Sequence, residues 1–144
     1  LFEYVEFVAI CVARSDLKLE KWGCMMSENV RNSQDAVVGE KEIMDGVSIS
    51  PRIIETNLGK AEIDFTEGDR PVLMGMHGGL GGVDQCRVAL DFAAREFRLL
   101  SLSRPGYLDT PLQSGQSLEA QVDLFAAILD ELGIDKVAVF ITCL

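Results

Sequence analysis

The sequence is poor in histidine and in positive charge, and it has no closely spaced pair of cysteines. Among its 144 residues, 13 are Lys or Arg and 23 are Asp or Glu, so the formal net charge is −10. Because a nucleic-acid backbone is bound by clustered cations, this balance argues against a nucleic-acid partner. The only histidine, His77, has no cysteine pair near it, which argues against a zinc site. We expect neither a metal nor a cofactor.

A long apolar run and a targeting segment are also lacking. Residues 1–13 are apolar, but they include Glu3 and Glu6, are too short to span a membrane and lack the basic start of a signal peptide. The four cysteines, at positions 11, 24, 86 and 143, predict buried or free thiols rather than a disulfide framework. We therefore expect a cytoplasmic protein with no membrane partner. Because the first residue is Leu rather than Met, we also expect a processed or incomplete chain.

The chain divides into two parts by the clarity of its patterns. Residues 1–50 follow no sustained period, and we treat them as an N-terminal extension of unassigned structure. The second part, residues 51–144, predicts strands over 52–57, 61–65, 72–76, 97–102 and 137–141, with helices over 84–96 and 117–133. Because strand–helix–strand units pair in parallel, this order predicts an α/β fold: a mostly parallel sheet with flanking helices and an N-terminal hairpin.

Local signals mark the ends of both helices. Asp84 is expected to cap the first helix, Ser117 the second, and Gly133 is expected to end the second helix. Apolar residues recur in the second helix at spacings of three and four, which predicts one stripe packed on the sheet: Leu118, Val122, Phe125, Leu129 and Leu132. The strand over 137–141 would present an uncovered apolar edge, and such edges predict self-association.

The strongest chemical signal is the run HGGLGG at 77–82, between a buried strand and a helix. Its glycines let the backbone approach a ligand closely, and amides beside a helix N-terminus favour a phosphate or a developing oxyanion. A dinucleotide fingerprint is not completed, because position 84 is Asp, and a P-loop would need Gly-Lys-Ser/Thr. A nucleotide-binding domain and a simple tight turn stay open as alternatives.

Three segments resemble the N-terminal half of the α/β-hydrolase fold family: PVLMGMHGGLGG at 71–82, FRLLSLSRPGYLDTPLQSGQSLEAQ at 97–121 and AAILDELGIDKVAVF at 126–140. The likeness covers residues 51–144 and implies an incomplete α/β-hydrolase fold. It also implies an oxyanion hole in which Gly79 N–H is one donor, with Leu80 beside it. His77 and Gly78 would support the loop. The implied substrate of the complete protein is a small molecule with an ester, amide or similar carbonyl bond.

The nucleophile of this family stands in a Gly-x-Ser-x-Gly turn after the fifth strand. Here that position falls on Cys143, two residues after Ile141, which stands where the turn needs a small residue. A buried strand-end cysteine is the alternative. Since the serines have only His77 available, no triad is complete, and we predict a hydrolase fragment that is inactive as given. A non-catalytic, truncated or binding chain of the same fold is the alternative function. Three residues either shape the cleft or lie solvated: Arg104, Tyr107 and Asp109.

Overall fold

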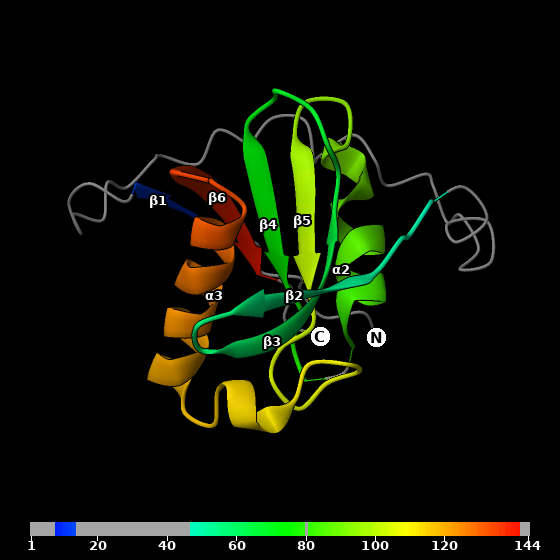
Figure 1. Cartoon of the computed structure of the whole chain (residues 1–144). Coiled ribbons are helices and arrows are strands. Elements are labelled where there is room, and N and C mark those ends of the chain that lie inside the picture. Colours follow the sequence, from blue (N-terminus) through cyan, green and yellow to red (C-terminus); the bar gives the residue numbers. More distant parts are fainter. Residues whose placement is uncertain (1–7, 14–46, 80, 142–144) are drawn as a thin grey trace.

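The computed structural model describes residues 8–13, 47–79 and 81–141, and these form one mixed six-stranded sheet with helices on both faces (Figure 1). Its strand order is β1-β6-β4-β5-β3-β2. The strands are β1 (Val8–Ala13), β2 (Arg52–Thr56), β3 (Gly59–Phe65), β4 (Val72–Met76), β5 (Arg98–Leu102) and β6 (Lys136–Ile141). The helices are α2 (Val83–Leu90) and α3 (Leu118–Glu131), with the short 3-10 turns η2 (Asp91–Ala93) and η3 (Leu112–Ser114). The predicted α/β fold class is confirmed.

Parallel pairing is confined to the middle of the sheet. Strand β4 pairs in parallel with β5 on one side and with β6 on the other, whereas β2 with β3 and β3 with β5 are antiparallel. This division follows from the connections: a tight turn joins β2 to β3, while α2 and α3 carry the chain back between the parallel strands. The predicted hairpin is therefore β2–β3.

Strand β1 lies in the segment to which the sequence assigns no structure. It pairs antiparallel with the whole of β6, from Val8 opposite Ile141 to Ala13 opposite Lys136. The prediction that β6 has an uncovered edge is wrong for this reason. The backbone groups along that edge of β6 are paired with β1, so they do not form the free edge from which self-association was predicted.

The two faces of the sheet carry separate apolar cores. Along β4, Val72 and Met74 pack into the core that contains α3, whereas Leu73 packs into the core under α2. The alternation follows from the period of a strand, whose successive side chains point to opposite faces. Since both faces are covered, β4 is apolar throughout. No helix in the described ranges combines the length and the hydropathy needed to cross a membrane.

The packed face of α3 differs from the predicted stripe. Leu118 and Val122 are 71% and 64% exposed. The buried side chains all come from the later turns of the helix: Leu124, Phe125, Ala127 and Ile128. Leu129 and Leu132 of the predicted stripe are partly buried against the same core. The stripe is thus correct only for its C-terminal part, Phe125, Leu129 and Leu132.

Both predicted ends of α3 are confirmed. Ser117 Oγ accepts a hydrogen bond from Ala120 N at 3.2 Å. Gly133 takes a left-handed φ of 65°, and its N–H donates to Asp130 O. Ile134 N donates to Leu129 O at 2.8 Å, which completes a Schellman motif. These bonds satisfy backbone groups that have no partner within the helix.

The start of α2 differs from the prediction. Gly82 is the N-cap residue, and Asp84 lies inside the first turn without capping it. The open N–H of Val83 is instead taken by Ser103 Oγ, at 2.9 Å, from the loop after β5. The helix also ends earlier than predicted, at Leu90, where the chain tightens into η2.

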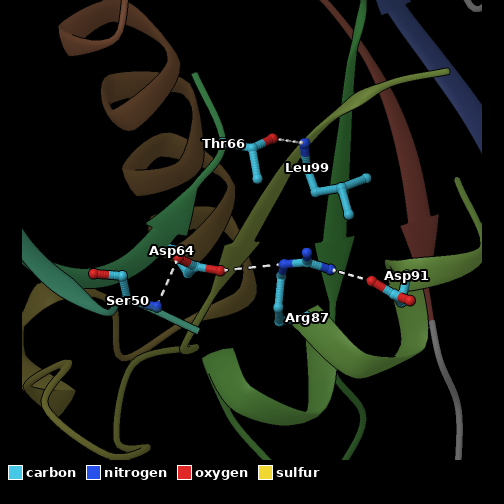
Figure 2. A network of polar contacts seen from close by, with 6 residues as sticks. All are labelled: Ser50, Asp64, Thr66, Arg87, Asp91 and Leu99. Carbon is cyan, nitrogen blue, oxygen red and sulfur yellow. Dashed lines mark hydrogen bonds and ion pairs between the residues drawn. The ribbon is translucent and has the colours of Figure 1, made fainter. Parts of the chain in front are cut away.

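A buried ion pair joins α2 to the sheet (Figure 2). Arg87 Nε on α2 lies 3.5 Å from Asp64 Oδ2 on β3, and the two side chains are only 9% and 7% exposed. The other carboxylate oxygen, Asp64 Oδ1, accepts a hydrogen bond from Ser50 N at 3.1 Å. Arg87 Nη1 also reaches Asp91 Oδ1 at 3.1 Å, where the carboxylate is half exposed. Elsewhere in Figure 2, Thr66 Oγ1 accepts from Leu99 N.

Candidate functional site

The glycine loop follows β4 at the carboxyl end of the parallel strands. The chain leaves β4 toward α2 on one face and leaves β5 toward α3 on the other face. Neighbouring parallel strands whose connections diverge in this way form a topological switch point, and open α/β sheets bind their ligands there. The candidate site therefore lies where the loops after β4 and β5 meet.

His77 links these two loops. Its side chain is buried, and its Nε2 accepts a hydrogen bond from Arg104 N at 2.9 Å. Because Nε2 is an acceptor, the ring proton is on Nδ1, which donates to Gly78 O at 2.9 Å. Burial lowers the pKa of His77 below its usual value of 6.5, and this outweighs the hydrogen bond to Gly78 O, which raises it; the charge of Arg104 lowers the pKa further and that of Asp84 raises it. The imidazole ring is thus neutral, and its two nitrogens link the loop after β4 to the loop after β5.

Tyr107 holds the glycine loop from the β5 side. Its hydroxyl donates to Gly79 O at 2.8 Å, and its ring meets the His77 ring edge-on, with centroids 4.6 Å apart. Arg104 contributes its backbone N–H to His77, while its Nε donates to Gln121 Oε1 on α3 at 3.2 Å. The sequence leaves open whether these residues shape the cleft. The structure shows that Arg104 and Tyr107 contact the loop, and that Asp109 is exposed.

The glycines of the loop have different structural roles. Gly81 adopts a φ of 146°, which other residues rarely adopt. A Cβ on Gly82 would overlap the side chain of Leu108, which is exposed and would have to move aside. Gly79, by contrast, is exposed, and a Cβ built on it has no atom within 4 Å among the described residues. Among the described residues, none fills the space beside Gly79.

A buried polar group behind the loop was missed by the sequence analysis. Ser103 Oγ donates to Glu62 Oε2 at 2.6 Å and accepts from Val83 N, and the residue is 1% exposed, so this hydroxyl is out of reach of a substrate. Glu62 N donates in turn to Thr110 Oγ1 at 2.8 Å. Alternation along β3 predicts that Glu62 faces solvent, but α2 covers that face and Glu62 is 6% exposed. No local signal would have revealed this group.

Three of the residues implied for the site, His77, Gly78 and Gly79, follow one another directly after β4. His77 Nδ1 donates to Gly78 O, and Gly79 O accepts from the Tyr107 hydroxyl. Leu80, the neighbour of the expected donor, and Cys143, at the expected nucleophile position, lie outside the described residues. Within the described part of the chain, no three His, Cys, Asp or Glu side chains are grouped so as to hold a metal ion.

Comparison with known proteins gives matches among solved structures. No protein-family model and no curated protein matches the chain. An α/β hydrolase fold protein from Nakamurella multipartita is 34% identical, with a TM-score of 0.56, over 59% of this chain and 29% of that one. A novel epoxide hydrolase from metagenomes of hot environments is 17% identical, with a TM-score of 0.52, over 60% and 30%. An epoxide hydrolase from an endophytic Streptomyces is 21% identical, with a TM-score of 0.51, over 63% and 28%.

The chain thus spans less than a third of the length of each of these structures. At 17% and 21% identity, the two epoxide hydrolases show the fold alone. The described residues of this chain therefore form part of an α/β-hydrolase fold.

Proposed function

We propose that this chain is part of a hydrolase that cleaves an ester, amide or similar carbonyl bond, and that it supplies one donor of the oxyanion hole, the N–H of Gly79. One observation carries the proposal. Gly79 lies exposed at the switch point of the sheet, and no described atom is within 4 Å of a Cβ built on it. The carbonyl of Gly78 accepts from His77, and the carbonyl of Gly79 accepts from Tyr107. Such an anchored amide is suited to an anion that forms only during a reaction.

The chemistry expected of this donor is electrostatic. Attack of a nucleophile on a carbonyl carbon transfers the π electrons to oxygen, which becomes negatively charged. A fixed N–H aimed at that oxygen stabilises the tetrahedral state, and removing one such donor costs about 10²–10³-fold in rate. His77 would not be the general base, because Nε2 accepts from Arg104 N and Nδ1 donates to Gly78 O. The nucleophile, the acid and the base are proposed to lie outside the described residues.

Epoxides are a second substrate class to be tested. Two of the matching structures are described as epoxide hydrolases, and ring opening also leaves negative charge on an oxygen.

A cytoplasmic location remains part of the proposal, supported by the unpaired and buried Cys86.

The test begins by sequencing the transcript upstream and downstream of the codons for residues 1–144. The longest reading frame that contains these codons is then expressed. Hydrolysis of p-nitrophenyl acetate, an aryl amide and styrene oxide is then measured. Gly79→Pro removes the donor, and we expect a loss of about 10²–10³-fold in kcat. Gly79→Ala keeps the N–H and has room for its methyl group, so its loss should be smaller.

Two results would contradict the proposal. Full activity in a folded Gly79→Pro protein would show that this amide is not a donor. No turnover of any substrate by the longest frame would favour the alternative, a non-catalytic binding chain of the same fold. The 144-residue chain by itself is expected to be inactive, so it serves as the negative sample in each assay.

A further inference from the structure

Gly79 needs external restraint if its N–H is to act as a fixed donor. It stands in a glycine-rich loop, and glycine has more accessible backbone conformations than any other residue. A donor that must be reoriented during the reaction stabilises the transition state less, because part of the interaction energy is spent on the reorientation. Other groups must therefore restrain the backbone of Gly79.

Two hydrogen bonds, one on each side, supply the restraint. His77 Nδ1 donates to Gly78 O, and that carbonyl belongs to the same planar peptide unit as the N–H of Gly79. Holding the carbonyl therefore sets the direction of the N–H. Tyr107 Oη donates to Gly79 O, which holds the next peptide unit at its carbonyl. With both units held, φ and ψ of Gly79 are restrained together.

The loop after β5 provides the Tyr107 hydrogen bond and also orients the His77 ring. Arg104 N donates to His77 Nε2 and so orients the imidazole ring, whose edge-on partner is the Tyr107 ring. The segment is itself closed by backbone hydrogen bonds: Tyr107 N donates to Arg104 O, Thr110 N to Tyr107 O and Gly106 N to Thr110 O, each at 3.0 Å. A rigid turn thus carries the hydroxyl to Gly79, 28 positions earlier in the chain.

We infer that Tyr107 is a positioning residue, which orients the Gly79 peptide groups through its hydroxyl and thereby presents the Gly79 N–H to the substrate. The catalytic part of this inference rests on the proposed function. The hydroxyl is the element that matters, since the aromatic ring alone would keep its contact with His77 but leave the Gly79 carbonyl without this donor.

The test compares Tyr107→Phe with a matched control. Tyr107→Phe removes one hydroxyl-to-carbonyl hydrogen bond and keeps the ring. Ser114→Ala removes a second hydroxyl-to-carbonyl hydrogen bond of the same length. In this bond Ser114 Oγ on η3 donates to Lys60 O on the β2–β3 hairpin at 2.8 Å, away from the glycine loop. Both variants are made in the longest reading frame, and the amide measurements are also made on the 144-residue chain.

We expect Tyr107→Phe to lower the ¹⁵N order parameter of the Gly79 amide, while Ser114→Ala leaves it unchanged. We further expect kcat for ester hydrolysis to fall about 10-fold or more at constant KM, because the oxyanion forms only in the transition state. Ser114→Ala should keep full activity. A melting temperature within about 3 °C of the parent protein would separate this effect from general unfolding.

The outcomes distinguish the two proposals. An unchanged Gly79 amide in Tyr107→Phe overturns the inference, whatever the activity. A loosened amide with unchanged kcat in an active protein also overturns it, because Tyr107 would then be structural only. A parent protein without turnover refutes the proposed function, and in that case the amide measurement alone decides whether Tyr107 orients Gly79.

Discussion

The buried ion pair between Arg87 and Asp64 should be costly to break from one side, because the remaining charge would be buried without its partner. At the 3.5 Å that separates Arg87 Nε from Asp64 Oδ2, two unit charges attract by about 5 kcal/mol at an effective dielectric constant of about 20. The contact lacks hydrogen-bond geometry, since neither atom has a hydrogen-bond partner. Asp64→Asn keeps the shape of the side chain and an acceptor for Ser50 N, but leaves the buried guanidinium without this carboxylate. Removing one partner of a buried pair costs about 3–5 kcal/mol, and we expect about 3 kcal/mol here.

The same arginine provides the control. Asp91 also pairs with Arg87, at 3.1 Å, but its side chain is 49% exposed. Exposed pairs of this type contribute about 0.3–0.5 kcal/mol, because water and salt screen them, so Asp91→Asn should cost less than about 1 kcal/mol. Urea denaturation of both variants at low salt and at about 1 M NaCl measures the difference. The cost of Asp64→Asn should persist in high salt, whereas that of Asp91→Asn should vanish.

The reasoning would be refuted if Asp64→Asn cost no more than Asp91→Asn. That result would mean that apolar packing by itself holds α2 on the sheet. A cost of Asp64→Asn that disappeared in high salt would also contradict it, because the pair would then be accessible to ions and not buried as the structure shows.

Three further predictions follow from packing, capping and titration. Gly75→Ala should lose about 1–3 kcal/mol of stability in urea, because the new Cβ would lie 2.8 Å from Leu90 Cδ1; Gly75→Ala combined with Leu90→Val should recover part of the loss. Ser117→Ala should cost about 1 kcal/mol and Ser117→Gly less, as seen in thermal melts followed by circular dichroism; equal costs would argue against capping. Burial raises the pKa of the Cys86 thiol to about 12 from the usual 9.0. Above pH 9 the unfolded chain releases this proton and the folded chain keeps it, so stability should fall as the pH rises toward 12, a slope that Cys86→Ala should reduce.

Much of the fold could be predicted because its signals are local. The alternation in 52–65, the apolar run of β4 and the spacing of apolar residues around Phe125 each depend on neighbouring residues only. Ser117 and Gly133 acted at the helix ends as predicted, since a cap contacts backbone groups within a few positions of itself. The position of the glycine loop after β4 was predicted from the same kind of pattern.

The errors arose where distant segments meet. The sequence does not show that β1 covers β6, because no local pattern names the partner of an edge strand. Asp84 was expected to cap α2, but Ser103, twenty positions after Val83, accepts the open N–H instead. Leu118 and Val122 are exposed despite their spacing, because spacing predicts which side chains share a helix face and not which turns of the helix are packed.

For the candidate site, the sequence by itself located the glycine-rich loop between β4 and α2, because a run of glycines between an apolar strand and a helix is a local pattern. Only the tertiary structure decided how that loop is held. The hydrogen bond from Tyr107 to Gly79 spans 28 positions, that from Arg104 to His77 spans 27, and that from Ser103 to Glu62 spans 41. Such contacts depend on the order of β3, β5 and β4 in the sheet, and that order is set by the packing of the whole chain.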